Sequence, residues 1–268
     1  MQKKLITFTK MHGLGNDFVI IDATSRSESL SLPIVQLADR HRGIGFDQLL
    51  LIEPSTQADF FCRIFNADGS EAEQCGNGLR CVARFIHENK LSRQTTFQVE
   101  TKAGMFAITI QDDDHISVTI DVPKFQPTVV ELHSKFFPYP LTANILSLGN
   151  PHAIINVTAV DAIAIEQLGA EISSQTNFPN GINIGFAQIC DSHHVRLRTY
   201  ERGVGETHAC GSNACATAYV GILNGWLTSP VSIEFRFGSL SIEYDEKNKF
   251  IRMIGPATKV FTGQVMIE

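Results

Sequence analysis

The sequence predicts an α+β fold of two similar domains, each a curved, mostly antiparallel sheet wrapped around a central helix, with the domains related by a pseudo-two-fold duplication. Three landmarks occur twice in the same order, 134 or 135 residues apart in a chain of 268. They are Leu14-Gly15-Asn16 with Leu148-Gly149-Asn150, Cys75-Gly76 with Cys210-Gly211, and Gly104 with Gly238. Because chance rarely repeats ordered landmarks, we infer a duplicated half.

Two further features extend the repeat. Each Cys-Gly pair lies nine residues after a polar residue, Asn66 in the first copy and Glu201 in the second. Ile44–Gln48 is echoed by Ile184–Gln188 at an offset of 140. We expect these segments to correspond as well.

Hydrophobic patterning predicts the elements of the first copy. Apolar runs at 5–8, 18–21 and 60–65 are typical of strands, and they are separated by turn residues. After Cys75, apolar residues recur at helical spacing as far as 89–90. Alternating residues over 97–110 and 115–122 then predict a hairpin.

The second copy predicts the same order. Strands are expected at 145–148, 153–157, 182–189 and 195–200, followed by a helix that begins at Cys210 and ends at Asn224-Gly225. A second hairpin over 231–254 follows. Both helices carry many small residues and few charges, which favours helices enclosed by a sheet.

Prolines separate the two copies, at positions 123, 127, 138 and 140. We therefore predict an N-terminal half at 1–122 that contains Cys75 and a C-terminal half at 123–268 that contains Cys210. The last few residues are candidates to return to the first domain.

Composition narrows the classes of function. The chain is 43% hydrophobic and 19% charged, with a mean hydropathy near zero and a net charge of −6. No Lys/Arg run or long apolar segment is present, which argues against nucleic acid or membrane as partners and favours a small molecule. We expect a cytoplasmic protein, whose six cysteines stay reduced.

The paired cysteines suggest acid–base chemistry. A thiol at a helix N-terminus faces unpaired N–H groups, which favour the thiolate and can also hold a carboxylate. One thiolate could remove the α-proton of an amino acid while an opposed thiol protonates the other face, in a cleft shared by both halves. Glu201 and His152 are candidates to tune the two thiols.

Four motifs together resemble diaminopimelate epimerases. They are Met11-His12-Gly13-Leu14-Gly15-Asn16-Asp17-Phe18, Asn66-Ala67-Asp68-Gly69-Ser70-Glu71 running to Cys75-Gly76-Asn77-Gly78, Gly149-Asn150-Pro151-His152, and Glu201-Arg202-Gly203-Val204-Gly205-Glu206-Thr207 running to Cys210-Gly211. The resemblance implies an epimerase without cofactor or metal that interconverts LL- and meso-diaminopimelate for lysine and peptidoglycan synthesis. It also implies a homodimer.

The resemblance implies roles for individual residues. Cys75 and Cys210 would be the acid and base, with His152 and Glu201 modulating them. The substrate-binding positions would be Asn16, Gln48, Asn66, Gly76, Asn77, Asn150, Asn183, Glu201, Arg202, Gly211 and Ser212. Asn213 departs from the pattern, because Gly is more usual at that place; Asn tolerates left-handed geometry, so we expect little disruption.

Less specific interpretations remain for several residues. Cys62, Cys81, Cys190 and Cys215 are expected to be buried small hydrophobes. Asn16 and Asn150 could serve only their turns, and His12 is expected to be structural. Rival functions are a proline or hydroxyproline racemase and a thiol redox or metal-holding protein, although Cys75–Cys81 and Cys210–Cys215 exceed the usual zinc-ligand spacing.

Overall fold

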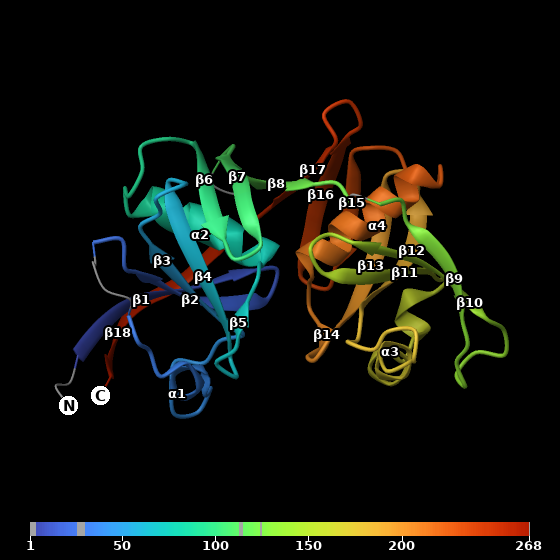
Figure 1. The fold of residues 1–268 in the computed structure, drawn as a ribbon, viewed down its shortest axis with the longest axis horizontal. Helices are drawn as coiled ribbons and strands as arrows, with labels where there is room; N and C mark the ends of the chain where they lie inside the picture. The colour runs from blue at the N-terminus through green and yellow to red at the C-terminus, as the bar shows by residue number, and fades with distance from the viewer. Residues whose placement is uncertain (1–3, 26–29, 113–114, 124, 268) are drawn as a thin grey trace. The chain divides into compact units, whose positions relative to one another are not determined.

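The computed structural model describes residues 4–25, 30–112, 115–123 and 125–267, and the chain forms two compact units (Figure 1). Unit 1 comprises 1–118 and 255–268, and unit 2 comprises 119–254. The boundary between the units lies four residues before the one expected from the prolines, and the last fourteen residues belong to unit 1.

In unit 1 the hydrogen-bonded strand order is β18-β1-β2-β3-β4-β6-β7-β8, with the short β5 beside β4. Where the described residues give a register, the pairs β2/β3 and β4/β6 are parallel and the others are antiparallel. The elements are β1 (Lys4–Gly13), β2 (Asn16–Asp22), α1 (Ile34–Ala38), β3 (Gln48–Glu53), β4 (Phe60–Asn66), β5 (Glu71–Ala72), α2 (Gly76–Glu88), β6 (Thr96–Thr101), β7 (Gly104–Ile110), β8 (Ile116–Asp121), which runs across the division at 118/119, and β18 (Thr258–Ile267).

Unit 2 repeats this topology as β9-β10-β11-β12-β13-β15-β16-β17, with β14 beside β13. Again two pairs are parallel, β11/β12 and β13/β15. The elements are β9 (Thr128–Leu132), β10 (Leu141–Ser147), β11 (Pro151–Asn156), the 3₁₀ helix η1 (Val160–Ala162), α3 (Ile165–Ser173), β12 (Asn183–Asp191), β13 (His194–Glu201), β14 (Gly205–Thr207), α4 (Gly211–Leu223), β15 (Val231–Phe235), β16 (Gly238–Asp245) and β17 (Phe250–Gly255).

The duplication predicted from the sequence is confirmed by this order and by its turns. Gly15 and Gly149 adopt φ of 90° and 91°, and Gly104 and Gly238 adopt 131° and 132°, conformations that favour glycine. β9 follows the first copy along the chain and pairs with β10, the first strand of the second copy. In the same way, β18 follows the second copy and pairs with β1, the first strand of the first copy.

One proposed correspondence is wrong. The parallel registers pair Phe18 with Gln48 in unit 1 and His152 with Asn183 in unit 2. Since Phe18 and His152 follow the Leu-Gly-Asn turns at the same distance, Gln48 corresponds to Asn183, at an offset of 135. The echo of Ile44–Gln48 in Ile184–Gln188 is coincidental.

The two helices that follow the cysteines are the buried helices of their units. In Figure 1 the strands of unit 1 curve around α2, and α4 is enclosed in the same way by strands of unit 2. Most residues of both helices are buried, including Leu79, Val82 and Ile86 in α2. Burial of this apolar surface stabilises each unit and fixes the helix N-termini.

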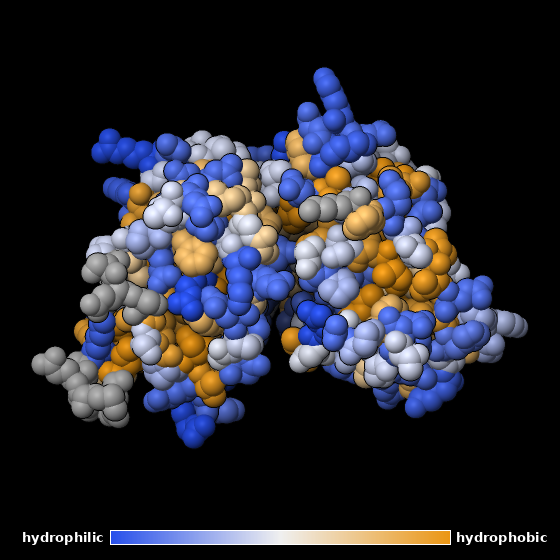
Figure 2. Space-filling model, in the orientation of Figure 1, coloured by the Kyte–Doolittle hydropathy of each residue, from blue (hydrophilic) through white to orange (hydrophobic). Residues whose placement is uncertain are grey.

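Some side chains and elements differ from expectation. Cys62, Cys81 and Cys215 are buried, but Cys190 is exposed, because it lies at the end of β12 beside a turn. The short helix α1 and the amphipathic α3 were not expected. Figure 2 shows hydrophilic side chains over much of the viewed faces, with apolar areas between them. Across the described residues, no helix combines the length and apolar character needed to span a membrane.

Candidate active site

Cys75 and Cys210 occupy the N-cap positions of α2 and α4. Both have extended backbone, with φ of −150° and −129°, as N-cap residues require. The Sγ of Cys75 accepts a hydrogen bond from the backbone N–H of Gly78 at 3.4 Å. The Sγ of Cys210 instead lies 3.4 Å from the hydroxyl of Ser212.

Asn16 joins Cys75 to the rest of its half-site. Its Oδ1 lies 3.8 Å from the Cys75 sulfur and accepts from Asn77 Nδ2 at 3.4 Å. Its Nδ2 donates to Asp47 at 3.0 Å. The turn between β1 and β2 places Asn16 here, so the asparagine serves the half-site as well as the turn.

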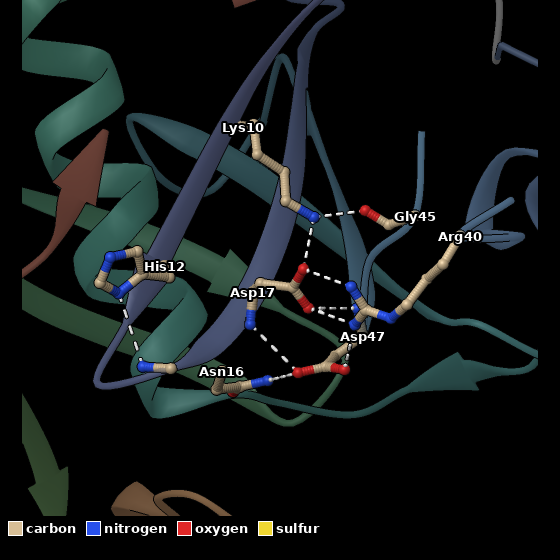
Figure 3. A network of polar contacts seen from close by, with 8 residues as sticks. Lys10, His12, Asn16, Asp17, Arg40, Gly45 and Asp47 are labelled. Carbon is tan, nitrogen blue, oxygen red and sulfur yellow. Dashed lines mark hydrogen bonds and ion pairs between the residues drawn. The ribbon is translucent and has the colours of Figure 1, made fainter. Parts of the chain in front are cut away.

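A network of charged residues contacts Asn16 through Asp47, as Figure 3 shows. Asp17 accepts from Lys10 and from Arg40, and Arg40 also reaches Asp47. Lys10 donates in addition to the Gly45 carbonyl. Burial alone would raise the pKa of Asp17, but the hydrogen bonds from Arg40 and Lys10 outweigh it and hold that pKa well below its ordinary value.

Gln48 and Asn66 meet on adjacent strands of unit 1. They are register partners between β3 and β4, and Gln48 Nε2 donates to Asn66 Oδ1 at 2.9 Å. Asn66 Nδ2 donates to Ser70 at 3.0 Å. Among the described residues, the buried Oε1 of Gln48 has no hydrogen-bond partner, so it is available to a ligand donor.

Arg80 was not predicted as part of the site. It is fully buried in α2 and donates to Asn77 Oδ1 at 2.9 Å and to the Pro256 carbonyl at 3.2 Å. Asn77 is thereby turned so that its Nδ2 faces Asn16. A guanidinium on the apolar face of the expected helix was the available signal, because such a group is rarely buried unless it has partners.

In unit 2 a chain of polar contacts leads from Cys210 to His152. Ser212 lies 3.3 Å from Asn150 Nδ2, and Asn150 Oδ1 lies 2.9 Å from His152 Nε2. The other ring nitrogen, Nδ1, lies 2.9 Å from Asn213 Oδ1. His152 therefore reaches Cys210 through Asn150 and Ser212.

His152 is completely buried in β11. Burial lowers its pKa to about 4, although the hydrogen bond that the ring makes to Asn213 Oδ1 acts in the opposite direction, and the nearby charge of Arg202 lowers the pKa further. The imidazole is consequently neutral at pH 7. A neutral ring carries one N–H, so it can donate to only one of its two neighbours.

The remaining predicted residues of unit 2 lie at the ends of β12 and β13. Glu201 accepts from the hydroxyl of Thr207 at 2.5 Å. Asn183 Nδ2 donates to the Pro151 carbonyl, and its Oδ1 accepts from the backbone N–H of Arg202 at 3.0 Å. The Arg202 guanidinium contacts the Asn180 carbonyl at 3.4 Å.

Each unit thus gathers its own share of the predicted residues. Unit 1 holds Asn16, Gln48, Asn66, Cys75, Gly76 and Asn77; unit 2 holds Asn150, His152, Asn183, Glu201, Arg202, Cys210, Gly211 and Ser212. In the described ranges no group of three or more His, Cys, Asp or Glu side chains is arranged to hold a metal ion.

Solved structures share this fold. A PhzF-family phenazine biosynthesis protein from Bacillus anthracis superposes with a TM-score of 0.73 at 18% identity, over 98% of this chain and all of that one. A hydroxyproline epimerase from Agrobacterium vitis, with trans-4-hydroxy-L-proline bound, gives 0.70 at 15% identity, over 98% and 93%. At these identities the likeness is one of fold.

Sequence relatives are much more similar. The family profile described as Diaminopimelate epimerase matches residues 8–126 and 145–260. A diaminopimelate epimerase of Ectopseudomonas mendocina is 42% identical over 98% of this chain and 100% of its own length. That of Nitrosomonas europaea is 45% identical over 97% and 98%. With two matched segments that each contain one of the helix-capping cysteines, the chain belongs to the diaminopimelate epimerase family.

Proposed function

We propose that this protein interconverts LL-2,6-diaminopimelate and meso-diaminopimelate without a cofactor, in the supply of lysine and peptidoglycan precursors. The observation that carries the proposal is the placement of Cys75 and Cys210 at corresponding helix N-caps of a duplicated fold. Membership of the diaminopimelate epimerase family is the reason for proposing diaminopimelate as the substrate.

The reaction needs a held carboxylate. The first turns of α2 and α4 present N–H groups that lack partners within their helices. Gly76 and Asn77, with Gly211 and Ser212, would donate these groups to the carboxylate next to the reacting carbon. Stabilising the charge that develops there lowers the barrier to loss of the α-proton.

Proton transfer would then use both sulfurs. The thiolate of one cysteine forms an S–H bond as the α-C–H bond breaks, and the thiol of the other gives its proton to the opposite face of the same carbon. The two cysteines end with exchanged protonation states, and exchange with water restores them. The mechanism requires both sulfurs to reach one stereocentre.

The second amino acid group of the substrate needs its own partners. Arg202 would bind the distal carboxylate, and amide oxygens such as the unpaired Oε1 of Gln48 would accept from the distal ammonium. Glu201 and His152 would tune the thiols, His152 through Asn150 and Ser212.

The closest rival function is racemisation or epimerisation of proline or hydroxyproline. Solved structures with this fold include one named a hydroxyproline epimerase and one named a probable proline racemase. We would incubate the protein separately with LL-diaminopimelate and L-proline in heavy water. Deuterium at the α-carbon of diaminopimelate, with meso product, is expected. Deuterium only in proline would replace our assignment with that of a proline racemase.

We also propose a cytoplasmic homodimer that binds neither nucleic acid nor membrane. Support for self-association comes from β1 and its edge neighbour β18, where the paired Leu5 and Met266 are 52% and 55% exposed and Phe261 is 46% exposed. Burying such side chains favours association. Light scattering should give a dimer for the protein and monomer for Leu5→Lys; a monomeric parent would refute the dimer.

A further inference from the structure

Asn213 differs from its counterpart in the repeat. The third residue after Cys75 is Gly78, whereas the third after Cys210 is Asn213, and both helices begin in the same way. The residue that packs against this position also differs between the units, because Leu50 of β3 corresponds to Gly185 of β12. Asn213 is fully buried, where side-chain polar groups need hydrogen-bond partners.

The space for Asn213 comes from this exchange of sizes. A Cβ built on Gly78 would lie 3.2 Å from Leu50 Cδ2, so unit 1 has little room for a side chain there. In unit 2 a Cβ on Gly185 would lie 3.3 Å from Asn213 Oδ1 and 3.0 Å from Ile154. The amide occupies the volume that Leu50 fills in unit 1.

One neighbour fixes the orientation of the Asn213 amide. Its Nδ2 lies 3.4 Å from the backbone carbonyl of Ile184, which can only accept. Turning the amide over would bring two oxygens together at that place. Asn213 therefore directs Oδ1 at His152 Nδ1, 2.9 Å away, and this nitrogen must carry the ring proton.

The orientation propagates toward Cys210. With its proton on Nδ1, neutral His152 accepts at Nε2. The Asn150 amide, whose Oδ1 lies 2.9 Å from Nε2, must then be turned over, so that its NH₂ faces the ring and its oxygen faces Ser212. This rotation is available because the Ser212 hydroxyl, unlike a backbone carbonyl, can either donate or accept. The structure places Asn150 Nδ2 3.3 Å from Ser212 Oγ; with the amide turned, Ser212 donates to the Asn150 oxygen instead, and its lone pairs face the Cys210 sulfur 3.4 Å away.

We propose that Asn213 is a positioning residue that sets His152 in the Nδ1–H tautomer and thereby directs the Ser212 hydroxyl proton away from Cys210. In that state Ser212 accepts from the Cys210 thiol rather than stabilising its thiolate. Gly78, by contrast, gives its N–H to Cys75. The consequence for epimerisation depends on the proposed function, whereas the tautomer does not.

The tautomer can be measured without substrate. In long-range ¹⁵N–¹H spectra at pH 7, with His152→Gln to assign the signals, we expect a protonated Nδ1 and an unprotonated Nε2 for His152. An Nε2–H tautomer or an imidazolium in the unaltered protein would overturn the proposal, whether or not any variant folds. A failed activity assay would leave this result unaffected.

Variants test whether Asn213 is the cause. Asn213→Ala should release the ring from the Nδ1–H tautomer, whereas Asn213→Asp, which keeps an acceptor, should retain a proton on Nδ1. Asn144→Ala, which removes another buried asparagine of unit 2, is the matched control. An unchanged tautomer in a folded Asn213→Ala protein would refute the assignment.

The cysteines provide a second readout. In Asn213→Ala the Ser212 hydroxyl becomes free to donate to the Cys210 sulfur, so alkylation of Cys210 by iodoacetamide at pH 7 should accelerate about fivefold. Cys75 in the same sample is the internal standard. Equal acceleration of both thiols would indicate general loosening and count against the proposal.

Discussion

The two half-sites share a backbone but surround their cysteines differently. Cys75 accepts an N–H from its own helix and contacts an asparagine that an ion network supports. Cys210 contacts a hydroxyl that leads to a buried imidazole. Corresponding positions hold Phe18 and His152, and Asp17 and Pro151. Duplication preserved the helix N-caps, while the residues behind them diverged to give two distinct thiols.

The largest effect should come from the cysteines themselves. Cys75→Ser and Cys210→Ser should each lower kcat for epimerisation by about 10³-fold or more, because a hydroxyl is a poor base at neutral pH. Cys190→Ser, at an exposed site, is the control and should retain activity. If one of the two variants kept full activity, the halves would not be equivalent in chemistry.

A pH titration of stability would test the neutral imidazole of unit 2. Unfolded His152 protonates near pH 6.5, whereas folded His152 stays neutral down to about pH 4. Its contribution is therefore fully present above pH 6.5 and is lost as pH falls to 4, by on the order of 3 kcal/mol. His152→Gln should remove this slope from the unfolding free energy; an unchanged slope would contradict burial of a neutral ring.

The ion network of unit 1 can be tested at Asp17. Asp17→Asn should destabilise the protein by about 2 kcal/mol, because partly buried Lys10 loses its charged acceptor. Urea denaturation would measure the change, with the exposed Asp22→Asn of the same strand as control. Equal midpoints for the two variants would mean that the network does not stabilise unit 1.

The smallest expected effect concerns the small and large side chains that alternate between the units, Gly78 with Leu50 in unit 1 and Asn213 with Gly185 in unit 2. Gly185→Ala should cost about 1 kcal/mol, because its Cβ would crowd Ile154 and Asn213. Asn213→Gly should relieve part of this cost, and a double-mutant cycle would give a coupling of about 0.5 kcal/mol. Strict additivity would show that the two positions do not share one volume.

Sequence patterns predicted the repeat, the two N-cap cysteines and the division of predicted residues between the halves, because turn glycines and helical periodicity are local signals. They did not predict the partners of Asn16 and His152, since Asp47 and Asn213 lie on other segments of the chain. The segments Ile44–Gln48 and Ile184–Gln188 have similar sequences but do not occupy corresponding positions. The strand pairings of Phe18 with Gln48 and of His152 with Asn183 were needed to show this.

The central claim is that Cys75 and Cys210 act on opposite faces of one carbon, and mild oxidation tests it most directly. Tandem mass spectrometry should find a Cys75–Cys210 disulfide that forms as epimerase activity disappears, that dithiothreitol reverses, and that diaminopimelate slows. Loss of activity without this bridge, or full activity with it, would contradict the account.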